Sequence, residues 1–149
     1  MSKRPAKLQG TPWLSPYLTV KDADAAIDFY QRAFGFEKRF AMPGPDGKTG
    51  HVEMVWREAM IMFGPEHTKD ECAYKAPVTT GVASPVGLYV YCEDVDALYA
   101  RAVAAGAKVV SAPVDQFYGD RQCTLEDPDG HRWFFATNVA DFDPSKAPG

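Results

Sequence analysis

The sequence predicts an α+β fold in which two β-α-β-β-β modules share one chain. The first observation behind this prediction is an internal repeat: the stretch YLTVKDADA at residues 17–25 returns as YVYCEDVDA at residues 89–97, a constant offset of 72 residues. Each copy passes from a strand-like run into a helix-like run, which is typical of two similar supersecondary units with a shared core. The second observation is size, since 149 residues with 46 % hydrophobic content suffice for one ordinary domain.

The first module is expected to begin with a strand from Trp13 to Val20. Asp22 can then cap a helix that runs to Phe34, and Gly35 can supply the left-handed residue that ends it. Apolar residues recur along this helix at helical spacing and predict a stripe that packs on a sheet. The stripe consists of Ala26, Ile27, Tyr30, Ala33 and Phe34. Three further strands are expected at Phe36 to Met42, Thr49 to Trp56 and Ala59 to Phe63.

The second module repeats this order after a polar stretch, residues 64–85, that is rich in Pro, Gly and Thr and lacks sustained periodicity. Its expected elements are a strand at 86–92, a helix from Asp94 to Gly106, strands at 108–112, 121–126 and 131–138, a loop at 113–120 and a turn at 127–130. The expected boundaries are an N-terminal extension (1–12), one domain (13–139) made of module 1 (13–64), a linker (65–85) and module 2 (86–139), and a frayed C-terminal tail (140–149).

Three motifs in this chain resemble the vicinal oxygen chelate superfamily, the group of glyoxalases, bleomycin-resistance proteins and extradiol dioxygenases. They are VKDADAAIDFY at residues 20–30 with Gly35-Phe36, EDVDA at 93–97, and DPDGH at 127–131. The segments YGDR at 118–121, EDPDGHRW at 126–133 and Ala136-Thr137 are most similar to the PhnB-like branch. The resemblance covers residues 13–139 and implies strands that form a curled mixed sheet around a central cavity, the glyoxalase/bleomycin-resistance fold, in a protein that is commonly a homodimer.

The resemblance also implies where a divalent metal would bind in an enzyme of this family. The ligands there are His, Gln or Glu on the first and fourth strands of each module, and the motifs place those positions near Ser15, Met62, Gly87 and Phe134. None of these four is a suitable ligand for a catalytic cation. A register slip of one residue restores no site, because the same strands contain no other His, Asp or Glu except His131 at its turn. We therefore expect a metal-independent protein without a cofactor.

Strand alternation identifies the side chains that would line the cavity. They are Ser15, Tyr17, Thr19, Met60, Met62, Gly87, Tyr89, Tyr91, Arg132, Phe134 and Ala136. Aromatic rings and thioethers offer large, adaptable apolar contacts to a hydrophobic or aromatic small molecule, and the tyrosine hydroxyls and Arg132 would orient its polar groups. The alternative is that these side chains simply fill the interior.

Two polar groups complete the candidate site. His51 and Glu53 share one face of a strand, where they could act as a general base, a ligand clamp or a partial metal site, or form an ordinary exposed pair. Tyr118 and Arg121 lie in or beside an aromatic loop that could cover the cavity mouth; the alternative is that Asp120 and Arg121 pin this loop. The predicted ligand-binding residues are thus Tyr17, His51, Glu53, Met62, Tyr89, Tyr91, Tyr118, Arg121, Arg132 and Phe134.

The composition excludes several classes of protein. With 16 basic and 20 acidic residues, the net charge of −4 disfavours a nucleic-acid partner. The longest apolar runs are far shorter than the roughly 20 residues of a membrane span, and no secretion signal is evident, so we expect a cytoplasmic protein without a membrane partner. Three cysteines without CxxC spacing indicate neither a disulfide framework nor a thiolate metal site.

The sequence therefore favours a small-molecule-binding protein of the glyoxalase/bleomycin-resistance type. It would act as a homodimer that sequesters an aromatic, antibiotic-like compound and so gives antibiotic resistance. The alternative is an enzyme, a metal-dependent lyase or dioxygenase of the same superfamily with an atypical site that uses His51, Glu53 or Arg121. A third interpretation, a domain that only mediates assembly, predicts a filled interior.

Overall fold

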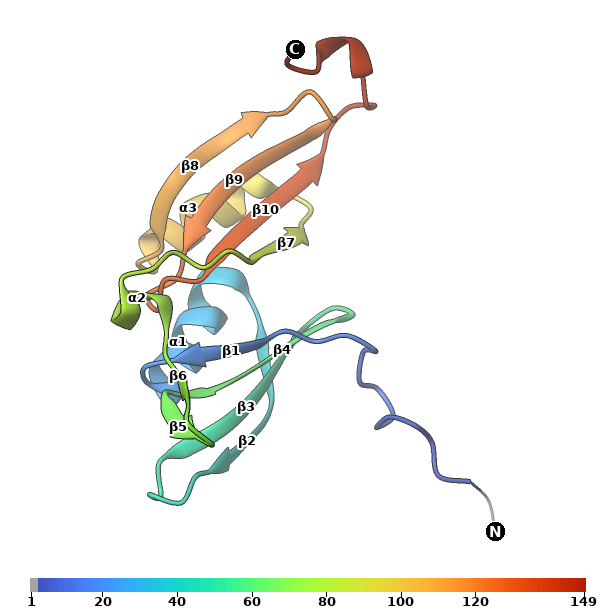
Figure 1. The fold of residues 1–149 in the computed structure, drawn as a ribbon. Coiled ribbons are helices and arrows are strands. Elements are labelled where there is room, and N and C mark those ends of the chain that lie inside the picture. The colour runs from blue at the N-terminus through green and yellow to red at the C-terminus, as the bar shows by residue number, and fades with distance from the viewer. Residues whose placement is uncertain (1–2) are drawn as a thin grey trace.

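The computed structural model describes residues 3–149, and it confirms the predicted α+β fold with two similar modules (Figure 1). The first two residues of the expected N-terminal extension lie outside the described residues. The first module contains β1 (Tyr17–Val20), α1 (Ala23–Phe34), β2 (Glu37–Pro43), β3 (Thr49–Trp56) and β4 (Ala59–Pro65). The second contains β7 (Gly87–Tyr91), α3 (Val95–Ala104), β8 (Lys108–Asp115), β9 (Asp120–Glu126) and β10 (Arg132–Asn138). A 3₁₀ turn, η1 (Pro144–Lys146), lies in the C-terminal tail.

Each module forms its own four-stranded mixed sheet. The strand orders, β1-β4-β3-β2 and β7-β10-β9-β8, are the same, so the sequence repeat is also a repeat of topology. In both sheets the first strand of the module runs parallel to the last one, with Tyr17 opposite Met62 and Tyr89 opposite Phe134. The other strand pairs are antiparallel. The expected curled sheet is therefore built as two sheets, one above the other in Figure 1.

The two main helices begin where the sequence predicts. The Asp22 side chain accepts a hydrogen bond from the Ala25 N–H at 2.9 Å, and the Asp94 side chain accepts one from the Ala97 N–H at 3.0 Å, which satisfies backbone donors that lack a partner at a helix start. Gly35 ends α1 with a φ of 78°, a left-handed conformation that glycine adopts without a steric penalty.

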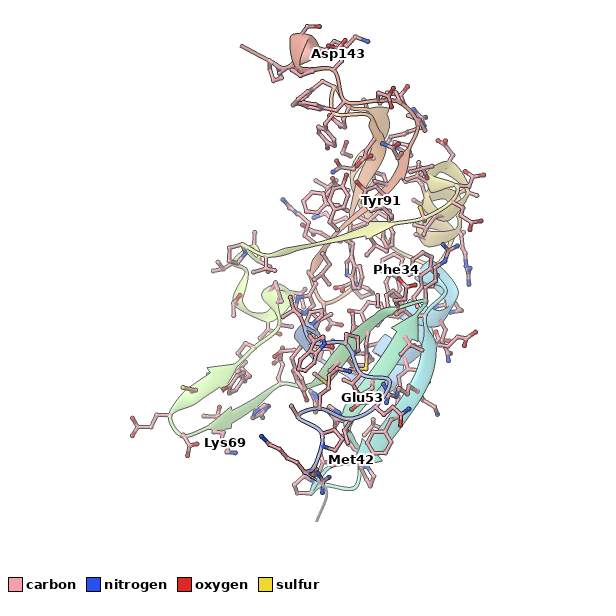
Figure 2. All side chains as sticks on the ribbon, turned by 90° about the vertical axis from the view of Figure 1, so that its right-hand side faces the viewer. Phe34, Met42, Glu53, Lys69, Tyr91 and Asp143 are labelled. Atoms are coloured by element: carbon pink, nitrogen blue, oxygen red, sulfur yellow. The ribbon has the colours of Figure 1, made fainter. Side chains whose placement is uncertain are left out.

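The core lies between the sheets and the helices α1 and α3, which pack against each other on the same side of the molecule. Its largest fully buried side chains include Trp133, Tyr30, Phe63 and Phe135. Burial of each such ring contributes about 1.5–3 kcal/mol to stability. Figure 2 shows Phe34 at the junction between the modules, with Tyr91 in the second module above it and Glu53 and Met42 in the first module below.

Two segments are more regular than the sequence indicates. The expected irregular linker contains a hairpin, β5 (His67–Lys69) with β6 (Cys72–Tyr74), and one helical turn, α2 (Pro77–Thr80). Strands of three residues are too short to produce a recognisable alternation. The sequence predicts a loop at Pro113, but the strand β8 continues through this residue. A proline is tolerated there because β8 is an edge strand and its pairing with β9 is interrupted by register shifts.

None of the helices within residues 3–149 combines the length and the apolar character needed to cross a membrane.

Candidate functional site

The side of each sheet that faces away from α1 and α3 carries most of the predicted site residues. We call these sides the first open face, on the sheet of module 1, and the second open face, on the sheet of module 2. Residues of the first open face are Tyr17, Phe40, Met42, His51, Glu53 and Met62. Residues of the second open face are Tyr89, Tyr91, Asp120, Gln122, Arg132, Phe134 and Asn138. The alternating neighbours, such as Leu18 and Val52, are buried under the helices, as the period of a strand requires.

A hydrogen-bonded chain of three side chains lies on the first open face. The Tyr17 hydroxyl is 3.1 Å from Nδ1 of His51, and Nε2 of His51 is 3.1 Å from Oε2 of Glu53. The Tyr17 and His51 rings also stack, with centroids 5.7 Å apart. When Nε2 carries the imidazole proton it donates to Glu53, and Nδ1 then accepts from the Tyr17 hydroxyl. Burial raises the pKa of Tyr17, so this hydroxyl stays protonated at neutral pH.

A pocket of about 460 Å³ adjoins this chain. Tyr17, Met42 and His51 form part of its wall, together with Glu66 and His67 from the start of the β5–β6 hairpin. His67 falls in the stretch expected as a linker (65–85) and is exposed, but nothing in the local pattern indicates that the β5–β6 hairpin returns it to the wall of this pocket. His67 is held there by stacking on Tyr74, with ring centroids 4.6 Å apart.

A buried carboxylate organises the second open face. Oδ2 of Asp120 accepts hydrogen bonds from the Tyr89 hydroxyl at 2.6 Å and the Tyr91 hydroxyl at 2.8 Å, while Oδ1 accepts from Nδ2 of Asn138 at 3.0 Å. The Asp120 residue is only 3 % exposed. The ring of Tyr89 stacks on Phe134, with centroids 6.1 Å apart and an interplanar angle of 25°.

These hydrogen bonds determine the charges on the second open face. Burial alone would raise the pKa of Asp120, but hydrogen bonds from Tyr89, Asn138 and Tyr91 outweigh it and lower that pKa, so the carboxylate is ionised at neutral pH. Burial, together with the bond to Asp120, raises the pKa of Tyr89. The bond to Asp120 is the main cause that raises the pKa of Tyr91. Both hydroxyls therefore keep their protons.

Arg121 is a correction to the predicted site. Its guanidinium lies on the helix side of β9, where Nε and Nη2 are each 3.0 Å from a carboxylate oxygen of Asp96 and Nη1 is 3.1 Å from Asp115. Strand alternation explains this placement, because Asp120 and Gln122, the neighbours of Arg121 in β9, occupy the open face. Arg121 thus fixes α3 to the sheet instead of facing a ligand.

Two other predicted residues lie at the second open face with partners of their own. Nη2 of Arg132 donates to Glu126 at 2.9 Å, which pairs the only guanidinium on this face within residues 3–149. The Tyr118 hydroxyl donates to Gln122 from the loop before β9. Neither partner was expected from the sequence.

The four positions that the resemblance implies for a metal carry side chains that do not suit a divalent cation. A Cβ atom added at Gly87 would lie 2.1 Å from the Phe134 ring, so this ring fills the space that a ligand at Gly87 would need. Met62 presents a thioether, and Ser15 presents one buried hydroxyl without a hydrogen-bond partner. One hydroxyl, a thioether and a phenyl ring are a poor ligand set for a hard or borderline divalent cation. In residues 3–149, no three side chains of His, Cys, Asp or Glu are grouped to hold an ion elsewhere.

Sequence reasoning missed five residues of the open faces, which are Phe40, Met42, Asp120, Gln122 and Asn138. Asp120 was assigned to the loop before β9, although its spacing of two from Gln122 was the signal that it continues the strand. Phe40 and Met42 were not included in the site. A bulge between Lys38 and Phe40 shifts their alternation, and no sequence pattern predicts where such a bulge falls.

Comparisons with known proteins agree with this architecture. The family model described as Glyoxalase/Bleomycin resistance protein/Dioxygenase superfamily matches residues 12–135. Uncharacterized proteins of Mycobacterium bovis and Mycobacterium tuberculosis are 41 % identical over 123 residues, which cover 82 % of this chain and 80 % and 72 % of those proteins, respectively.

Solved structures show the same fold. TioX from Micromonospora sp. ML1 is 27 % identical, with a TM-score of 0.67 over 85 % of this chain and 98 % of TioX. A bleomycin resistance determinant encoded on the transposon Tn5 is 23 % identical, with a TM-score of 0.61 over 87 % of this chain and all of the determinant's chain (100 %).

Proposed function

This chain belongs to the glyoxalase/bleomycin resistance protein/dioxygenase superfamily, and from that membership we propose that it binds an aromatic or hydrophobic small molecule on its open faces without a bound metal. Binding would keep the compound from its target, and no chemical change of the ligand is required. We also propose that the protein belongs to the PhnB-like branch, that it is cytoplasmic and that its ligand resembles an antibiotic. The likeness in fold to a bleomycin resistance determinant supports the last of these.

The observation that carries this proposal is the exposure of large apolar side chains on both open faces. Tyr17 is 53 % exposed, Met42 49 %, Tyr89 45 % and Tyr91 56 %. Contiguous exposed apolar surface of this kind usually marks a binding site, since leaving it in water has a free-energy cost. The side chains do not fill a closed interior, which argues against a domain that only mediates assembly.

We also propose that the chain works as a homodimer. The pocket beside Tyr17, Met42 and His51 has no lining residue from the second open face, so it does not enclose a ligand between the two faces of one chain. If the first open face of one protomer faced the second open face of its partner, the two would form a chamber lined by rings and thioethers. Sedimentation equilibrium tests this part, and a monomer at micromolar concentration would contradict it.

A thermal-shift screen with natural products tests the proposal, because a ligand that binds only the folded state raises the apparent stability. For a compound found in this way, Tyr89→Ala and Phe134→Ala should weaken binding strongly, since each removes an aromatic contact. Tyr99→Ala on α3, away from the open faces, is the control and should leave affinity unchanged. Equal losses in all three variants would mean that the ligand binds elsewhere.

A second candidate function is acid–base catalysis, and the chain Tyr17–His51–Glu53 beside the pocket favours it. A carboxylate that accepts from Nε2 orients the imidazole so that Nδ1 can take a proton from a hydroxyl or a bound substrate. The other form of an enzyme, a metal-dependent lyase or dioxygenase with an atypical site at His51 and Glu53, is tested by titration of the purified protein with Mn, Fe, Ni, Zn or Co. Stoichiometric metal binding that His51→Ala abolishes would favour an enzyme with an atypical site.

A further inference from the structure

Asp120 is an ionised carboxylate that no cation neutralises within residues 3–149. Its three partners, Tyr89, Tyr91 and Asn138, are neutral donors. The adjacent Arg121 is committed to Asp96 and Asp115 on the opposite side of the sheet. A buried charge that has hydrogen bonds but no counter-ion creates a negative potential at the surface next to it.

The hydroxyl groups around Asp120 have a fixed orientation. Tyr89 and Tyr91 each have one hydroxyl hydrogen, and both hydrogens point to Oδ2 of Asp120. The oxygens can therefore offer only lone pairs to a ligand. A ligand group that meets them has to donate hydrogen bonds, and a group that can only accept finds no partner there.

Aromatic rings surround the same point. Tyr89 and Tyr91 meet edge to face with centroids 5.5 Å apart, and Phe134 stacks on Tyr89. Both tyrosines are about half exposed, so their rings are accessible from solvent. The face of an aromatic ring attracts cations through its quadrupole, and the attraction increases when the cation loses water.

We propose that the second open face recognises a cationic N–H donor, such as a protonated amine, amidinium or guanidinium, carried by the aromatic ligand. This inference rests on the proposed function and specifies the class of ligand at that site. The cation would contact the tyrosine rings and hydroxyl oxygens above Asp120, and the apolar body of the ligand would lie along Phe134. The first open face differs, because its Tyr17 hydroxyl meets an imidazole and its carboxylate, Glu53, has that imidazole as a partner.

Three probes of nearly equal size test this proposal at neutral pH: naphthylmethylamine, which is cationic, naphthalenemethanol, which is neutral, and naphthoic acid, which is anionic. By isothermal calorimetry the amine should bind at least about tenfold more tightly than the alcohol, as expected for a partly desolvated cation on aromatic rings. The acid should bind most weakly because Asp120 repels it.

The variant Asp120→Asn should abolish the advantage of the amine and leave the affinity for the alcohol unchanged. The control is Asp28→Asn on the exposed surface of α1, which changes the net charge equally and should keep the advantage. Tyr91→Phe retains the ring but removes one acceptor oxygen, so it should reduce the advantage of the amine, whereas Tyr99→Phe should not.

The outcomes separate this inference from the proposed function. If the wild-type protein binds the amine and the alcohol equally well, the inference is overturned and the proposed function stands. The same result is expected if a lysine or arginine of a second copy neutralises Asp120. An advantage that persists in Asp120→Asn would likewise overturn it. Binding of none of the three probes would overturn both.

Discussion

The two open faces occupy equivalent places in the repeat but differ in the group that holds their tyrosine. Tyr17 and Tyr89 correspond across the repeat, and each lies on a strand parallel to the last strand of its module. The Tyr17 hydroxyl meets the imidazole of His51, whereas the Tyr89 hydroxyl donates to the carboxylate of Asp120. The repeat thus preserves the position of the ring and the hydroxyl, while each module supplies its own polar partner.

This difference gives the faces different chemistry. The first open face has an imidazole hydrogen-bonded to a carboxylate, a pair that can exchange a proton with a ligand. The second open face carries a carboxylate that three donors keep ionised. One face is thus suited to proton transfer and the other to holding a charge of constant sign.

The largest expected difference between the two faces is in the stability lost when each loses its carboxylate, in Asp120→Ala and in Glu53→Ala. Loss of Asp120 leaves three donors without their acceptor and should lower the free energy of unfolding by about 2–3 kcal/mol. Loss of Glu53 removes one partner from His51 and should cost about 0.5 kcal/mol. Urea denaturation measures both values, and equal losses would show that Asp120 does not organise its face.

A smaller effect is expected when a methyl group is added at a glycine on each face. A Cβ atom at Gly64 would lie 2.8 Å from the carbonyl oxygen of Gly50, which belongs to the backbone of β3 and cannot move easily. We expect Gly64→Ala to cost about 2 kcal/mol.

At Gly87 the obstacle is the Phe134 ring, a side chain that can turn toward solvent, so Gly87→Ala should cost only about 1 kcal/mol. That turn would, however, disrupt the stack with Tyr89 and weaken aromatic ligands. Urea denaturation and probe binding measure the two consequences. A greater loss of stability at Gly87 than at Gly64 would mean that the Phe134 ring yields less easily than the backbone of β3.

The pH dependence of stability provides a subtler test. Because the pKa of Asp120 is lower in the folded state, its contribution is complete above the unfolded pKa of about 3.9 and is lost as the pH falls through the folded pKa. The stability difference between the wild-type protein and Asp120→Asn should therefore shrink in acid.

Asp129 serves as the comparison, because burial raises the pKa of its carboxyl, whereas the pKa of Asp120 is lowered. Its contribution is complete below the unfolded pKa and is lost as the pH rises through the folded pKa, so the wild-type protein should lose stability relative to Asp129→Asn over that range. Urea denaturation at a series of pH values measures both differences. Parallel trends in the two variants would contradict the opposite environments assigned to these carboxylates.

Local signals in the sequence predicted most of the fold. The capping aspartates, Asp22 and Asp94, and the glycine after α1 are short-range features, and the structure confirms the helices that they predict. The alternation of side chains along β1 and β7 was also predictable. Tyr17 in β1 and Tyr89 and Tyr91 in β7 were therefore expected on the ligand-facing side of their strands. The polar partners were harder, because the contact between Asp120 and Tyr89 joins strands far apart in the chain, and no local pattern specifies it.

The smallest expected effect concerns the two arginines of the second sheet. Arg121→Ala should leave the affinity for naphthylmethylamine unchanged in calorimetry, because the guanidinium binds Asp96 and Asp115 on the helix side. Arg132→Ala should tighten binding of the same probe, because it leaves the Glu126 carboxylate on the open face without its guanidinium partner and so adds negative potential near the ligand. Weaker binding in Arg121→Ala, without a matching loss of stability, would mean that this guanidinium faces the ligand and that β9 presents the opposite side to solvent.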